Sequence, residues 1–106
     1  MRYLIIPFLV LVLAGLSAPA QSTVAEALCS AYKPVAESAL DLRRQGIPLA
    51  TAESMARGAH STDRNLYRYL IMSIRAIYEN PDTMAQRLED GTWHQLCVRF
   101  VMTGRL

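Results

Sequence analysis

The stretch GTWHQLCVRF, residues 91–100, brings a histidine and a cysteine close enough together for chemistry. His94 and Cys97 are three positions apart, so on a helix their side chains lie about 60° from each other around the axis and can meet. Such a pair could form a nucleophile with its base, a redox-active thiol or part of a metal site. A reactive thiol must be reduced and partly exposed, and a metal needs further ligands, yet the only other cysteine and histidine are Cys29 and His60. We therefore expect no catalytic residue, no metal and no cofactor.

The first segment of the chain, residues 1–20, has the anatomy of a secretory signal peptide. One positive charge precedes an apolar run, and small residues stand at the third and first positions before a predicted cleavage site after Ala20. The alternative is an uncleaved anchor, but the run is shorter than the roughly twenty apolar residues that cross a bilayer. We expect residues 1–20 to be removed and residues 21–106 to form a single small domain in the periplasm or outside the cell, without stable membrane insertion.

Both cysteines, Cys29 and Cys97, lie in this mature part of the chain. Export to an oxidising compartment together with an even number of cysteines predicts one disulfide between them. A free thiol and a metal ligand are the alternatives for Cys97. The predicted bridge would tie the first segment of the domain to the last and contribute about 4 kcal/mol in the chain-entropy model. A domain this small hides only about 60 to 68 % of its unfolded surface, so such a bridge matters to its stability.

Charge and motifs exclude several classes of function. The chain has 11 basic and 9 acidic residues and a formal net charge of +2, which gives no electrostatic reason to expect binding to nucleic acid or to an anionic membrane. The sequence contains no G-x-S-x-G, phosphate-binding loop, H-E-x-x-H, calcium loop or C-x-x-C motif. We therefore expect a protein that is not an enzyme.

The longest periodic segment, residues 23–44, predicts a helix with a wide buried face. Its apolar residues recur at spacings of three and four in two neighbouring rows. Thr23 and Glu26 fit a capping box at its start, and the sequence RRQGIP at 43–48 supplies a helix stop. Pro34 lies inside the segment and predicts a kink, because proline removes one backbone hydrogen bond.

Three further segments have helical patterns. Residues 49–59 predict a short helix, and residues 63–79 predict the central helix, since apolar residues cover most of its circumference. Residues 82–101 predict the last helix, with Trp93 as a core anchor and Gly91 as a point where it could bend or break. The expected fold is all-α, a small bundle of about four helices whose first and last members are joined by the disulfide.

Two sets of surface residues are candidates for contact with a partner. Arg64, Arg68 and Arg75 form a basic row on the central helix, which is either a solvated face paired with acids of neighbouring helices or a docking strip for an acidic partner. Asp90 and His94 are four residues apart on the expected last helix. This spacing either supports the helix or, because histidine changes charge near neutral pH, makes a pH-sensitive contact.

Four short features follow one another along residues 29–97. They are Cys29, the pattern R-x-x-G-x-P-L at 43–49, the pattern A-I-Y-E-x-P at 76–81, and Cys97 in a closing aromatic-rich helix. In this order the chain resembles a group of small exported helical proteins of proteobacteria and their phages, for which no activity is known. The resemblance implies an exported protein with a signal peptide and two such cysteines.

These observations together favour a binding function over a catalytic one. We expect a periplasmic, non-catalytic protein-binding protein, of the kind that acts as an inhibitor or an immunity protein. Its partner would be a protein of the cell envelope or a toxin. The alternative is a stress chaperone activated by acid, which would loosen below about pH 4 as carboxylates lose their charge. An enzyme whose chemistry the motifs do not reveal is the third hypothesis.

Overall fold

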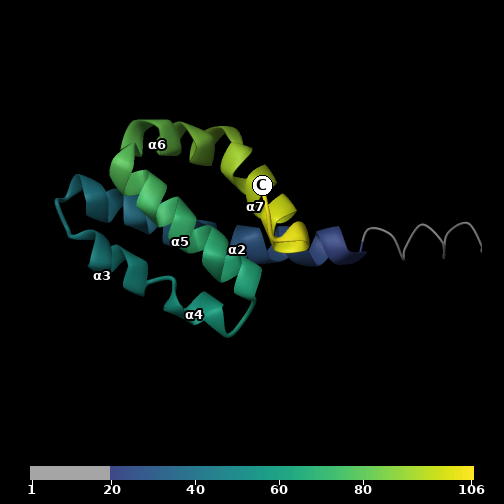
Figure 1. The fold of residues 1–106 in the computed structure, drawn as a ribbon. Coiled ribbons are helices and arrows are strands. Elements are labelled where there is room, and N and C mark those ends of the chain that lie inside the picture. Colours follow the sequence, from purple (N-terminus) through teal and green to yellow (C-terminus); the bar gives the residue numbers. More distant parts are fainter. Residues whose placement is uncertain (1–19) are drawn as a thin grey trace, which may run out of the picture.

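The computed structural model describes residues 20–106, which form six helices and no strand (Figure 1). The expected leader lies outside the described residues except for Ala20, the first residue of the first helix. The all-α class is confirmed, and the number of helices exceeds four because two of the expected segments are each divided. The helices are α2 (Ala20–Arg44), α3 (Leu49–Ser54), α4 (Arg57–His60), α5 (Arg64–Glu79), α6 (Pro81–Asp90) and α7 (Thr92–Thr103).

Helix α2 differs from the expectation at its start, and its proline does not split it. It begins at Ala20, so Thr23 lies inside the helix and is not its cap. The helix continues without a break through Pro34. Ser30, whose carbonyl loses its usual hydrogen-bond partner at this proline, lies on the exposed side, where water can reach that carbonyl. The end of α2 follows the sequence signals, since Gly46 has a left-handed φ of 79° just beyond it.

The two apolar rows on α2 contribute unequally to the core. The buried residues are Ala25, Cys29, Ala36, Ala39 and Leu40. Of these, only Ala39 comes from the row that starts at Val24, which is 60 % exposed, and Leu28, Val35 and Leu42 of that row are partly buried and pack against the core. The buried face of α2 is therefore narrower than the sequence pattern predicts.

The expected helix over residues 49–59 consists of two short helices, α3 and α4, joined by a turn at Met55 and Ala56. Both lie along one side of α5, and α6 and α7 lie along the other side (Figure 1). The chain between α2 and α3 is fixed by Tyr78 of α5, whose hydroxyl donates a hydrogen bond to the carbonyl of Ile47 at 2.7 Å. This contact holds the start of α3 beside the C-terminal end of α5.

Helix α5 is the central helix, as predicted. Asp63 caps it, since its side chain accepts a hydrogen bond from the backbone N–H of Leu66 at 2.9 Å. The helix ends before Asn80, and Pro81 occupies the first turn of α6. One face of α5 is buried against the other helices. Its buried residues are Leu66, Tyr69, Leu70, Ser73, Ile74 and Ile77.

Gly91 breaks the expected last helix into α6 and α7. Its φ of 88° and ψ of −4° are left-handed, a conformation that glycine adopts at little cost. The break lets α7 turn back toward α2, where Cys97 forms the predicted disulfide with Cys29. Both cysteines have no exposed surface, so the bridge lies within the core.

A closed hydrogen-bond network surrounds the indole of Trp93, which is 1 % exposed. The indole Nε1 donates to Ser73 Oγ at 2.9 Å, and Ser73 Oγ donates to the carbonyl of Tyr69 at 2.8 Å. The Tyr69 hydroxyl in turn donates to the carbonyl of Trp93 at 2.8 Å. Burial raises the pKa of Tyr69 to about 12, although Ser73 and the charge of Arg87 oppose this rise. Trp93 is therefore the core anchor that the sequence predicts.

Candidate protein-binding surface

The three arginines of the predicted basic row all lie on the exposed side of α5. Arg75 Nε is 2.8 Å from Glu53 Oε2, and this is the only ion pair between residues 20–106. The guanidinium of Arg68 lies over the ring of Phe100, 5.2 Å from its centroid. Of the three arginines in the row, only Arg75 is thus paired with an acidic residue of a neighbouring helix.

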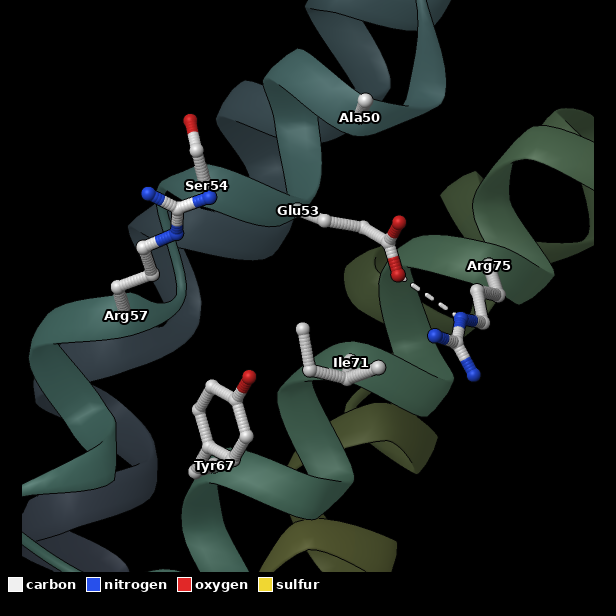
Figure 2. A pocket seen from close by; sticks show the side chains of 7 residues that line it. All are labelled: Ala50, Glu53, Ser54, Arg57, Tyr67, Ile71 and Arg75. Atoms are coloured by element: carbon white, nitrogen blue, oxygen red, sulfur yellow. Dashed lines mark hydrogen bonds and ion pairs between the residues drawn. The ribbon is translucent and has the colours of Figure 1, made fainter.

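A hollow lies between α3 and α5, beside this row (Figure 2). Its volume is about 250 Å³. A second hollow on the outer side of α5 shares Tyr67, Ile71 and Arg75 with the first. The two form one continuous region, which we call the α3/α5 surface. Its lining residues are Ala50, Glu53, Ser54, Arg57, Tyr67, Arg68, Ile71, Met72 and Arg75.

The α3/α5 surface combines positive charge with apolar side chains. Three arginines, Arg57, Arg68 and Arg75, and one acidic residue, Glu53, line it. Met72 lies between Arg68 and Arg75 in the sequence, and its side chain is 41 % exposed. Arginine, tyrosine and methionine are enriched in the centres of protein interfaces, where they provide large contact areas and directed hydrogen bonds. The α3/α5 surface therefore contains residue types that protein interfaces favour.

Sequence reasoning found only part of this surface. Arg68 and Arg75 line it, whereas Arg64 is exposed one turn before Arg68 and lines neither hollow. It missed Glu53 and Arg57, because their approach to α5 depends on how α3 and α4 pack. The signal that could have found them is their spacing of four residues across the turn between two short helices, together with the basic row opposite.

Asp90 and His94 do not form the predicted helix pair. Gly91 separates them into different helices, and no ion pair joins them within the described chain. Asp90 instead accepts a hydrogen bond from the backbone N–H of Thr92 at 2.9 Å. Hydrogen bonding from Thr92 lowers the pKa of Asp90, and the nearby charge of Arg87 adds to this effect. His94 is partly exposed in the first turn of α7, and whether it contacts a partner stays an open prediction.

The disulfide removes the chemistry that His94 and Cys97 could otherwise share. A cysteine in a disulfide has no thiolate to act as a nucleophile or a metal ligand. Within residues 20–106, no group of three or more histidine, cysteine, aspartate or glutamate side chains is placed to hold a metal ion. Among the helices of the same part of the chain, none combines the length and apolar character needed to cross a membrane.

Comparison of the chain with models of protein families, with curated proteins and with solved structures finds no match. The class that the fold and the site define is a small all-α protein, closed by a buried disulfide, that presents an arginine-rich surface. The α3/α5 surface and the chemistry of its residues are therefore the features of residues 20–106 that bear on function.

Proposed function

We propose that this chain is an exported, non-catalytic protein-binding protein that binds an acidic segment of its partner through the α3/α5 surface. The observation that carries the proposal is that Arg68 and Arg75 line one hollow with the exposed Met72, and Arg57 lines the adjoining hollow, whereas Glu53 is the one acidic residue that lines either. Arg57 and Arg68 form no ion pair with residues 20–106, and the guanidinium of Arg68, which lies over the ring of Phe100, keeps its N–H donors free of a carboxylate.

The chemistry of arginine specifies the kind of partner. A guanidinium binds a carboxylate through two parallel N–H donors, so a surface with several arginines favours a segment rich in aspartate or glutamate. Met72 and Tyr67 offer apolar area between the charges, which lets a partner bury surface as well as pair charges. Opposite charge on the two surfaces would also speed their encounter at low salt.

The rest of the molecule fits an inhibitor or an immunity-type protein of the periplasm. Helix α5 presents Arg68 and Arg75 on its outer side, while Leu66, Leu70 and Ile74 anchor its inner side with no exposed surface. Such backing holds the binding side chains in place before the partner arrives, which reduces the ordering cost of binding. A buried disulfide suits an oxidising compartment. The partner class we propose is an envelope protein or a toxin.

The experiment compares two purified double variants with the wild-type protein. Arg68→Glu with Arg75→Glu reverses the charge of the α3/α5 surface. Arg99→Glu with Arg105→Glu makes the same change in net charge at exposed positions outside that surface. Each protein is immobilised and incubated with envelope extract, and the proteins retained are identified and tested again as purified components.

We expect an acidic partner that the wild type and the Arg99 and Arg105 variant retain and that the Arg68 and Arg75 variant loses. Near-UV circular dichroism of Trp93 verifies that all three proteins are folded, since that side chain is fixed in the core. Equal retention of every partner by all three proteins would rule out the α3/α5 surface as the binding site.

A further inference from the structure

One carboxylate within the α3/α5 surface already occupies the position that a ligand would take. Glu53 extends from α3 toward α5, and its Oε2 lies 2.8 Å from Arg75 Nε (Figure 2). Glu53 is the only acidic residue among those that line the surface. Arg57 and Arg75 lie on opposite sides of the hollow that contains this carboxylate, and Tyr67 and Ile71 line the hollow between them (Figure 2).

The contact between Glu53 and Arg75 leaves most of the guanidinium free. It runs through Nε alone, so the two terminal nitrogens of Arg75 donate to no other residue in the described part of the chain. A carboxylate that binds arginine through two parallel hydrogen bonds makes a stronger contact than this single one. The side chain of Arg75 is 62 % exposed and that of Glu53 is 25 % exposed, so water reaches the pair mainly from the side of the arginine and screens it there.

We infer that Glu53 is an intramolecular competitor for an incoming carboxylate, and that the hollow between α3 and α5 takes one aspartate or glutamate side chain of an acidic segment. This inference rests on the proposed function and names the position at which one carboxylate of the ligand binds. The incoming carboxylate binds the guanidinium of Arg75 and displaces Glu53 toward solvent. Glu53 sets the affinity, since each binding event must break its contact with Arg75 and overcome its negative charge.

The probe is a blocked peptide of six glutamates, titrated into the purified exported protein at low salt and followed by calorimetry. Glu53→Gln keeps the size of the side chain and removes its charge, so we expect it to bind the peptide about fivefold more tightly than the wild type, the equivalent of about 1 kcal/mol. The matched control is Glu26→Gln, which removes the same charge from an exposed position of α2. We expect this control to bind within about twofold of the wild type.

Arg75→Gln provides the second arm. In that background Glu53 has lost its partner, so Glu53→Gln should give a smaller gain than it gives alone, and this difference separates competition at Arg75 from general repulsion. Equal gains from Glu53→Gln and Glu26→Gln, or equal gains with and without Arg75, would overturn the inference and leave the docking surface standing. Binding that is unaffected by Arg68→Glu with Arg75→Glu would overturn the docking surface itself. Absence of peptide binding in every variant would overturn both.

Discussion

The disulfide between Cys29 and Cys97 should supply a large part of the free energy of unfolding. The two residues are 68 positions apart, and the bridge closes that length of chain into a loop. In the chain-entropy model a loop of this length lowers the entropy of the unfolded state by the equivalent of about 4 kcal/mol at 25 °C. Domains of this size are stable by roughly 5 to 10 kcal/mol, so removal of the bridge should leave the fold marginal.

The assay is urea denaturation of the oxidised protein, of the same protein reduced with dithiothreitol, and of the double variant Cys29→Ala with Cys97→Ala. Reduction keeps both sulfurs in the core, so it isolates the effect of the loop. The double variant adds the loss of two buried sulfur atoms and should be less stable by a further 1 kcal/mol or so for each. The slope of free energy against urea should rise in both, because an unfolded chain without the bridge exposes more surface.

Reduction should also be slow, since neither cysteine has exposed surface and the reagent must wait for the core to open. A fall of less than about 1 kcal/mol in the free energy of unfolding on reduction, with an unchanged urea slope, would refute the argument that the bridge acts on the unfolded chain.

Three further predictions concern stability. Ser73→Ala leaves the indole N–H of Trp93 buried without a partner and should cost about 1 to 3 kcal/mol; in a Trp93→Phe background the same change should cost less, which a double-mutant cycle by urea denaturation would measure. Gly91→Ala should destabilise by about 1 to 2 kcal/mol because its φ is 88°, whereas Gly58→Ala, in a helical turn with equally open space around it, should stabilise by about 0.5 kcal/mol in the same assay. The pKa of Asp90 is lower in the folded state, so its contribution to stability is present above its unfolded pKa and is lost as pH falls through the folded value; thermal melts of the Asp90→Asn variant should accordingly show a weaker acid dependence than those of the wild type below about pH 4.

Local signals in the sequence determined where most helices begin and end. Asp63 and Pro81 mark the boundaries of α5 and α6, because a cap and a proline act within one turn of the chain. Gly91 correctly predicted an interruption of the last helix, and its left-handed φ shows that the interruption is a break and not a bend. The turn between α3 and α4 has no such signal, since Met55 and Ala56 are ordinary helix formers.

The burial of α2 shows what periodicity leaves open. Two neighbouring apolar rows have the same spacing, and the pattern alone does not choose between them. Cys29 belongs to the row that faces α7, so the bridge to Cys97 fixes the rotation of the helix. Val24 of the other row is then exposed, and Leu28, Val35 and Leu42 are only partly buried. The candidate site has the same limit, because Glu53 meets Arg75 only through the packing of α3 against α5.

The position of α5 explains how one helix can serve both the core and the proposed binding surface. Its inner residues are completely buried, so changes there disturb the whole bundle, whereas its outer arginines contact few neighbours. An exposed ion pair such as that of Arg75 contributes at most about 1 kcal/mol, and the contact of Arg68 with Phe100 adds a similar amount. Substitutions of these arginines can therefore change affinity strongly while the fold persists. This separation makes the binding surface open to mutational tests, because a loss of binding in a folded variant reports on the surface itself.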